Sequence, residues 1–345
     1  MTVINTSISP ALEGFMPWLK VSGLQFLLPT KITQVLVATR EFRQYMDETI
    51  ARERMKPATA DTKLNLISTL IKATDTADQA TKARLSDVEL RGNIFIFTVG
   101  GLESTSITLS YALALLAIHP EIQEWVVAEV LEVMNESEAE YAKAFPKLTR
   151  VMAVMVCTNH SPSPTSPYLD ESNIQAKYET LRIYGPSPPL PRSSATPHTS
   201  FSLPTTSDSS DASKLITLPP STQIMLNSWA CHTSASHFPN PKTWDPKRWI
   251  QSNGALMHPT PGLGFFAWGA GPRICPGMKF SQVEFCAVLA SVLNKVRVGL
   301  RVEADEKHEA EKARLLSVLN DTIAEPLLLH VRRPEELWLQ IAQRE

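Results

Sequence analysis

Apolar residues recur at helical spacing over much of the chain, in stretches separated by polar segments rich in proline, serine and threonine. Over residues 31–55 and 62–74 this spacing predicts two amphipathic helices. A third helix is predicted over 120–134, and a fourth begins at Leu148. The last pattern is interrupted and resumes over Tyr178–Tyr184, so one helical pattern is divided by a segment of different composition.

The longest apolar stretch predicts a single helix from Asp87 to about Ile118, where Pro120 prevents its continuation. Ser86 and Glu89 have the spacing of a capping box, which marks the start of a helix. At 1.5 Å per residue this helix would be roughly 45–50 Å long. Because its residues are apolar nearly all round, we expect it to be buried through the middle of a large domain.

Beyond residue 185 the pattern changes to short strands and loops. Strands are predicted at Ile216 and at Ile224–Leu226, on either side of the Pro219–Pro220 turn. The remaining predicted elements are, in chain order, a loop, the final helix and two strands: 239–273, Ser281–Leu293, 326–331 and 337–341. The fold class expected from these patterns is mainly α with minor β.

Composition places the chain among globular proteins. Of its 345 residues 43% are hydrophobic and the formal net charge is -2, so a sizeable core is possible and a basic nucleic-acid binder is excluded. Four cysteines, at 157, 231, 275 and 286, are too scattered for a disulfide framework, which favours a reducing compartment. Residues 1–30 contain neither a membrane-spanning apolar run nor a signal peptide.

Residues 100–105, Gly-Gly-Leu-Glu-Ser-Thr, interrupt the apolar pattern of the long helix. Each glycine costs about 1 kcal/mol in a helix interior, and a buried glutamate is costly unless its carboxylate is satisfied. Taken alone, the segment is explained by two helices that cross at the glycines, with neighbours that satisfy the polar side chains.

The segment Trp268–Gly277 carries the most specific chemistry of the sequence. Its Cys275 precedes a predicted helix, whose positive end favours a thiolate over a thiol. Gly271 and Gly277 let the backbone approach a flat ligand closely, and Arg273 is suited to pair with a carboxylate. A thiolate in this setting fits the axial ligand of a haem iron. The alternative is a buried structural cysteine in a turn.

This segment resembles the haem-binding loop of the cytochrome P450 family, F-x-x-G-x-R-x-C-x-G. Gly271, Arg273, Cys275 and Gly277 match the pattern, and Trp268 stands where most members have phenylalanine. The resemblance implies that these residues bind haem b, with the Cys275 thiolate as the metal ligand. It also implies an incomplete cytochrome P450 fold with a long central I-type helix, a K-type helix, the haem-binding cysteine loop and a following L-type helix.

Two further segments resemble motifs of the same family. Glu179-Thr180-Leu181-Arg182 resembles the E-x-x-R of the K helix, in which the two charges share a helix face and can pair. By itself this motif is a weak signal, because solvated helices contain it often. Asp245–Trp249 resembles the later P-E-R-F motif, and its Arg248 would complete a Glu–Arg–Arg cluster behind the haem loop.

Residues 100–105 resemble the A-G-x-D/E-T-T segment of the family's I helix. The resemblance implies that the glycines open the helix where oxygen binds, and that Glu103, Ser104 and Thr105 are catalytic residues that deliver protons. Ser104 replaces the usual threonine. It keeps the hydroxyl but loses the β-branch, so its rotamer is less fixed and a leakier proton relay is expected.

The resemblance implies a monooxygenase of the fungal secondary-metabolism type, which inserts one atom of dioxygen into a small hydrophobic substrate. Its electrons would come from NADPH through a cytochrome P450 reductase, and the endoplasmic reticulum membrane is the expected location. Two alternatives stay open. One is a truncated, non-catalytic fragment or pseudoenzyme that does not hold haem stably, and the weaker one is a cysteine hydrolase that uses Cys275.

The resemblance covers only the C-terminal two-thirds of the family's fold, so the membrane anchor and the first part of the fold are expected to be absent from this chain. Residues 1–155 and 178–345 are expected to form one truncated haem-thiolate domain, divided by a foreign Pro/Ser-rich insert at 156–177. Val156-Cys157 is the translation of a splice-donor sequence, GTATGT, and the codon AAG for Lys177 ends in the acceptor AG. Deleting the insert restores one amphipathic helix. We therefore expect an unspliced intron here, with a real surface loop as the alternative.

Overall fold

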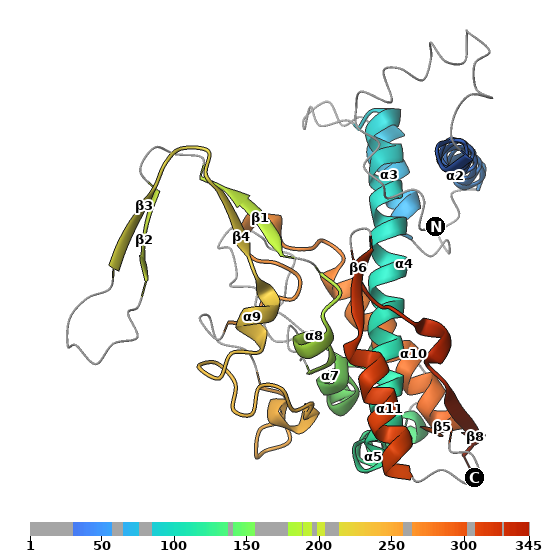
Figure 1. The fold of residues 1–345 in the computed structure, drawn as a ribbon. Coiled ribbons are helices and arrows are strands. Elements are labelled where there is room, and N and C mark those ends of the chain that lie inside the picture. Colours follow the sequence, from blue (N-terminus) through green and yellow to red (C-terminus); the bar gives the residue numbers. More distant parts are fainter. Residues whose placement is uncertain are drawn as a thin grey trace. The chain divides into compact units, whose positions relative to one another are not determined.

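The structure is a computed structural model, drawn as a ribbon in Figure 1. The chain divides into two compact units, residues 1–104 with 325–327 and residues 105–324 with 328–345, and each is described by itself. The residues that the structure describes are 30–56, 65–75, 85–136, 141–155, 179–187, 189–194, 199–203, 214–257, 264–301, 308–325 and 328–344. The fold is mainly α with minor β, as the sequence predicts.

The first unit is built from helices α2 (Thr30–Arg54), α3 (Leu66–Asp75) and the N-terminal part of α4 (Asp87–Ile118). Both predicted amphipathic helices are therefore present, although residues 62–64 of the second lie outside the described part of the chain. Apolar side chains from all three helices meet in a small core: Met46, Ile50, Ile71, Leu90 and Ile94.

Helix α4 has the predicted bounds, and its start has the predicted capping box. The Glu89 carboxylate accepts a hydrogen bond from the Ser86 backbone N–H at 2.8 Å, and the Ser86 hydroxyl oxygen accepts one from the Glu89 N–H at 3.2 Å. The second of these bonds satisfies one of the N–H groups that the first turn of a helix leaves unpaired. The local sequence is therefore sufficient to explain why the helix begins at Asp87.

The expectation that α4 is buried along its whole length is wrong. Its C-terminal part, from Tyr111 to Ile118, is largely buried, whereas Val88, Ile96 and Leu102 of its N-terminal part are 76%, 57% and 56% exposed. The apolar pattern is continuous along the helix, but burial depends on neighbours, which the pattern does not encode. In length and composition α4 is comparable to a membrane-spanning helix. The buried core helix of a soluble protein can have the same length and composition.

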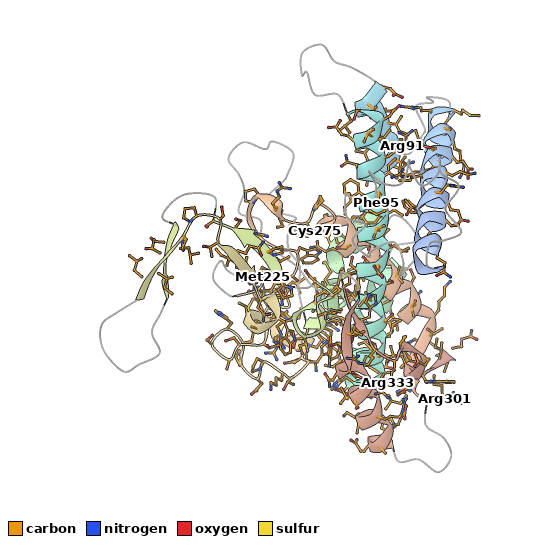
Figure 2. The ribbon with its side chains drawn as sticks, turned by 45° about the horizontal axis from the view of Figure 1, so that its top comes forward. Arg91, Phe95, Met225, Cys275, Arg301 and Arg333 are labelled. Carbon is orange, nitrogen blue, oxygen red and sulfur yellow. The ribbon has the colours of Figure 1, made fainter. Side chains whose placement is uncertain are left out.

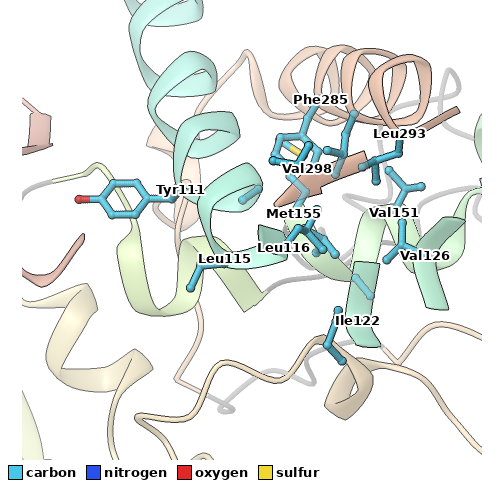
Figure 3. Packing of buried hydrophobic residues seen from close by; sticks show 14 of the residues in the cluster. Tyr111, Leu115, Leu116, Ile122, Val126, Val151, Met155, Phe285, Leu293 and Val298 are labelled. Atoms are coloured by element: carbon cyan, nitrogen blue, oxygen red, sulfur yellow. The ribbon is translucent and has the colours of Figure 1, made fainter. Parts of the chain in front are cut away.

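The second unit is organised around the helical core shown in Figure 3. Helix α10 (Met278–Lys295) packs against α5 (Pro120–Glu136) and α7 (Thr149–Met155), which also pack against each other. Side chains of these helices and of the end of α4 share one cluster, which includes Leu116, Val126, Val151, Met155, Phe285 and Leu293. Burial of an apolar side chain of this size contributes about 1.5–3 kcal/mol, so this cluster is a main source of the unit's stability.

Helix α7 begins where the buried Glu129 of α5 caps it. The Glu129 carboxylate accepts hydrogen bonds from the Thr149 hydroxyl at 2.7 Å and from the backbone N–H groups of Arg150 and Val151 at 2.7 and 3.1 Å. Burial raises the pKa of Glu129 above its ordinary value. The start of α7 is therefore fixed by a tertiary contact, which no local capping signal in the sequence could reveal.

Helices α7 and α8 (Glu179–Tyr184) carry the two parts of the helical pattern that the sequence interrupts, and they pack against each other. The predicted insert, residues 156–177, lies outside the described residues, so its origin stays a prediction. Two short helices, α6 (Tyr141–Ala144) and α9 (Ser228–His232), connect the larger elements.

The helix predicted over Ser281–Leu293 is present as α10, but it is not the last one. A further helix, α11 (His308–Asn320), follows it. Charged residues are frequent in α11, and only Glu311, Leu315, Val318 and Leu319 are buried. This short apolar stripe explains why the hydrophobic pattern alone did not predict the helix.

The strands described in the structure form four two-stranded sheets. The two strands predicted around the Pro219–Pro220 turn are present as β3 (Lys214–Leu218) and β4 (Gln223–Leu226), but they do not pair with each other. Instead β4 pairs antiparallel with β1 (Leu190–Ser193), and β3 pairs antiparallel with β2 (Thr199–Leu203). The sequence did not predict β1 or β2, because both lie in a segment rich in proline, serine and threonine that is typical of loops.

Both predicted C-terminal strands are present, as β7 (Leu328–Val331) and β8 (Leu339–Gln343). β8 pairs antiparallel with β5 (Val296–Leu300), which directly follows α10, and β7 pairs with β6 (Thr322–Glu325). The sequence pattern did not predict β5 or β6. In β5 the strand begins without a breaker after the helix, so the change from helical to extended backbone has no local signal.

Candidate active site

The charged residues of the E-x-x-R segment and Arg248 form one buried cluster. Glu179 and Arg182 of α8 are both 0% exposed, and Glu179 accepts hydrogen bonds from Arg182 Nη2 at 2.8 Å and Nε at 2.9 Å. Arg248, in the 3-10 helix Pro246–Trp249, donates through Nε to Glu179 Oε1 at 3.0 Å. The three residues that the sequence analysis grouped are therefore in contact, through charge-assisted bonds that are among the strongest in proteins.

The Glu179 carboxylate has two further donors, which the sequence analysis did not single out. Trp249, 1% exposed, donates through its indole N–H to Oε2 at 2.8 Å, and Asp245 donates through its backbone N–H to Oε1 at 2.9 Å. A signal for Trp249 was present, because it ends the same motif as Arg248 and a buried tryptophan needs an acceptor for its N–H.

The two arginines use their other N–H groups on backbone carbonyls of the last residue of α9 and of the segment that follows it. Arg182 donates to the carbonyl oxygens of His232 at 2.8 Å and Thr243 at 3.1 Å, and Arg248 donates to those of Pro239 at 2.8 Å and Thr243 at 3.1 Å. Buried ion pairs are stable only when such additional bonds satisfy them. The cluster therefore fixes the irregular segment between α9 and the 3-10 helix.

Cys275 lies in the loop before α10 and is labelled in Figure 2. Its backbone N–H donates to the Trp268 carbonyl at 2.9 Å, and the Ile274 N–H donates to the Gly271 carbonyl at 3.0 Å. Gly269 and Gly271 have φ angles of 80° and 71°, in the left-handed region where a side chain is disfavoured. Glycine at these two positions therefore permits the turn that closes the loop.

The Cys275 side chain is exposed, shortly before α10 begins at Met278. A Cβ atom at Gly277 would lie 3.8 Å from Cys275 Sγ, so glycine leaves the space beside the sulfur open. Cys286 differs from Cys275 in both respects: it is buried inside α10, and burial raises the pKa of its thiol well above the usual value. Of these two thiols, Cys275 is the one that can reach a ligand.

Trp268 and Arg273 lie on the loop that carries Cys275, but only Arg273 is exposed. The Trp268 indole N–H donates to Ser281 Oγ at 3.2 Å, which fastens the loop to α10. Arg273 is exposed, where its guanidinium can pair with a carboxylate of a bound group. An open cysteine sulfur at the positive end of a helix, a glycine beside it and a nearby exposed cation together fit a haem.

Glu103, Ser104 and Thr105 lie in α4, with Ser104 in the first unit and Thr105 in the second. The opening that the resemblance implies is not present, because α4 runs unbroken and the Ser104 hydroxyl donates to the Gly100 carbonyl at 2.7 Å, a bond compatible with a continuous helix. Thr105 is 4% exposed, and its Oγ1 has no hydrogen-bond partner among the described residues. An unpaired buried hydroxyl costs free energy, and the buried Tyr111 hydroxyl also lacks a partner among the described residues.

Comparison with curated proteins finds cytochrome P450 monooxygenases of fungi among the relatives. A cytochrome P450 monooxygenase of Arthrobotrys oligospora is 26% identical over 311 residues, which are 79% of this chain and 47% of that protein. The phomenoic acid biosynthesis cluster cytochrome P450 monooxygenase of Leptosphaeria maculans is 27% identical over 275 residues, which are 72% of this chain and 41% of that protein. The chain spans about half the length of these relatives.

Comparison with solved structures and with family models agrees with this result. A crystal structure of a cytochrome P450 matches with a TM-score of 0.63 and 20% identity, over 93% of this chain and 60% of that one, which shows a common fold. The family model described as Cytochrome P450 matches residues 4–323, a range that contains the Glu179 cluster and the Cys275 loop. The chain therefore belongs to the cytochrome P450 family.

Proposed function

We propose that this chain is the haem-binding part of a cytochrome P450 monooxygenase, which inserts one atom of dioxygen into a small hydrophobic substrate. The observation that carries the proposal is the exposed Cys275, which lies before α10 with Gly277 beside its Sγ. A bound haem would supply the iron chemistry that activates dioxygen. The chain's own residues would hold the haem, exclude water and move protons.

In this proposal, different residues of the Cys275 loop make different contacts with the haem. Cys275 would bind as a thiolate, since the positive end of α10 favours the charged sulfur. Arg273 would pair with a carboxylate at the edge of the haem. Gly271 and Gly277 let the backbone come close to the flat group, and Trp268 holds the loop against α10.

Glu103, Ser104 and Thr105 are proposed to carry protons to the reacting site. In the structure the Ser104 hydroxyl donates to the Gly100 carbonyl, so this hydrogen bond must break before Ser104 can donate elsewhere. Because serine has no β-branch, its side chain can change rotamer to reach a new acceptor. The buried Thr105 hydroxyl has no such competing bond among the described residues and is free to donate to a new acceptor.

The proposal extends to the partners and the location of the whole protein. Electrons would come from NADPH through a cytochrome P450 reductase, and the protein would act at the endoplasmic reticulum membrane. A role in secondary metabolism is supported by the relative in Leptosphaeria maculans, which is named for a biosynthesis cluster. Cell fractionation of the tagged native protein tests the location, since recovery in the cytosol contradicts it.

A second candidate is a non-catalytic fragment that does not hold haem stably. One observation favours it: the chain covers only 47% and 41% of the two relatives described above. If the remaining length supplies residues that enclose the haem, this chain alone would expose the group to water and lose it.

One experiment separates the two candidates. The full chain is expressed with haem supplied, and the difference spectrum of the reduced protein with and without carbon monoxide is recorded. The monooxygenase predicts the Soret band of a thiolate-bound iron, which Cys275→Ser removes and Cys286→Ala keeps. Absence of haem uptake by the wild-type chain supports the fragment instead.

We also propose that residues 156–177 are an unspliced intron. The helical pattern on either side of this segment and the packing of α7 against α8 support the proposal. Sequencing of the transcript tests it directly. A mature message that lacks the 22 codons supports an intron, and a spliced message that retains them contradicts it.

A further inference from the structure

His232, the last residue of α9, is a buried imidazole between the Glu179 cluster and the Cys275 loop. Its side chain is only 3% exposed, and its ring stacks on that of Phe265 with the centroids 4.5 Å apart. No role for it follows from the motifs of the sequence. Its contacts on the two sides, however, belong to different parts of the site.

On one side the imidazole holds the start of the loop. His232 Nε2 accepts a hydrogen bond from the Phe266 backbone N–H at 2.9 Å. A ring nitrogen can accept only when it carries no proton, so the imidazole is neutral, with its proton on Nδ1. Burial and the charge of Arg182 keep it neutral, because together they lower its pKa to about 3.

On the other side His232 is bound to α8. Its backbone carbonyl accepts the Arg182 Nη1–H at 2.8 Å. The same arginine is paired with the buried Glu179. His232 is therefore anchored to a fully buried ion pair.

From Phe266 a short chain of backbone bonds leads to the cysteine. The Phe266 carbonyl accepts the Gly269 N–H at 2.8 Å, and the Trp268 carbonyl accepts the Cys275 N–H at 2.9 Å. The position of Phe266 therefore sets the register of the turn that carries Cys275.

We propose that His232 is a positioning residue that transmits the rigidity of the Glu179–Arg182 pair to the Cys275 loop through its bond to the Phe266 N–H. The expected effect of His232 on haem binding rests on the proposed function. Its expected effect on the loop does not. Without the acceptor, the Phe266 N–H would be left unpaired and the loop would open more often.

Two substitutions separate the acceptor from the ring. His232→Phe keeps an aromatic ring against Phe265 and removes the acceptor, whereas His232→Gln offers a side-chain oxygen where Nε2 lies. His308→Phe, at an exposed position of α11, is the matched control for a histidine-to-phenylalanine change elsewhere. Cooperative thermal unfolding checks that each variant is folded.

The first readout is backbone hydrogen exchange of the haem-free full chain, followed in peptides that cover residues 264–277. We expect exchange there to be at least about fivefold faster in His232→Phe, since a buried hydrogen bond is lost. His232→Gln should restore most of the protection, and His308→Phe should match the wild type. A wild-type rate in His232→Phe would overturn the proposal, as would a Gln variant as fast as the Phe variant.

The second readout is the carbon-monoxide difference spectrum of the haem-loaded chain. In His232→Phe a larger share of the reduced protein should show the band of iron that has lost its thiolate, and His232→Gln should reverse the change. If the wild type shows no thiolate band, the proposed function fails while hydrogen exchange still decides the role of His232. If the wild type shows the band and all variants match it, this inference alone fails.

Discussion

The Glu179 cluster and the Cys275 loop are neighbours in function and opposites in physical character. Glu179 and Arg182 are entirely buried and paired, and the carboxylate accepts bonds from four residues. Cys275 is exposed, and its loop depends on glycines with positive φ. The cluster is arranged for stability, whereas the loop leaves its cysteine accessible.

This difference shows how a stable framework and an accessible cysteine can be provided by separate parts of the molecule. A side chain that must bind a ligand cannot also pack its exposed surface against the protein. Its position therefore has to be fixed by contacts of other residues. Buried, fully satisfied ionic bonds do this without occupying the face of the cysteine. Substitutions in the cluster should therefore affect folding, and substitutions at the sulfur should affect binding alone.

The largest effect is expected for Glu179→Ala. The substitution leaves two arginines without their carboxylate, one of them wholly buried, and breaking a buried pair costs about 3–5 kcal/mol. Glu124→Ala is the control, because this carboxylate is about half exposed in its pairs with Arg297 and Arg344, each of which should contribute less than about 1 kcal/mol. Denaturant unfolding measures both, and equal losses would remove the distinction between cluster and surface.

Acid should weaken the link between cluster and loop through His232. The unfolded chain takes up a proton on this histidine near its ordinary pKa of 6.5, but the folded chain does so only near 3, because of burial and the charge of Arg182. Between these values the unfolded state binds more protons, so stability is lost as the pH falls. The loss is at most about 1.4 kcal/mol per pH unit.

The pH effect is measured as a difference between two proteins. The free energy of unfolding of the wild type and of His232→Gln is followed from pH 7 to pH 4.5. Because the other titrating groups are common to both, the steeper decline of the wild type isolates His232. Parallel curves would show that this imidazole is not held neutral in the folded protein.

A smaller loss is expected for Trp249→Phe. The phenyl ring retains most of the packing against Phe238 and Phe265, but the indole N–H bond to the Glu179 carboxylate is lost. A hydrogen bond to a charged group contributes about 2 kcal/mol. Trp229→Phe, at a residue 57% exposed, should cost far less in the same thermal-unfolding assay. If the two variants unfold alike, Trp249 is not a member of the cluster.

The smallest change in stability is expected for Cys275→Ser, within about 0.5 kcal/mol, because the side chain is exposed. The buried Cys286 provides the contrast. Cys286→Ser places a hydroxyl in an apolar core and should cost about 1–3 kcal/mol. Thermal unfolding of the haem-free chain compares them, and a large loss at Cys275 would mean that the loop cysteine is structural.

Local chemistry made some of these features predictable from the sequence. The start of α4 follows from Ser86 and Glu89, and its end from Pro120. The pairing of Glu179 with Arg182 follows from their spacing on one helix face. The Cys275 loop could be recognised because its glycines, arginine and cysteine are adjacent in the chain.

Other features depend on residues far apart in the chain. Trp249 and Asp245 reach Glu179 across more than sixty positions, and His232 reaches Phe266 across 34. The cap of α7 comes from another helix, and the apolar side chains of α4 are buried or exposed according to what packs beside them. None of these contacts has a periodic or local signal.

The sequence by itself determined the family and the bounds of the long helix, and it predicts the ligand chemistry of Cys275, because each rests on residues that act with their near neighbours. Only the tertiary structure decided that the Glu179 carboxylate binds Trp249, that Val88, Ile96 and Leu102 of α4 are exposed and that His232 connects the buried cluster to the loop. The reason is physical: burial and long-range hydrogen bonds are properties of a packed neighbourhood, which forms only when distant segments fold together.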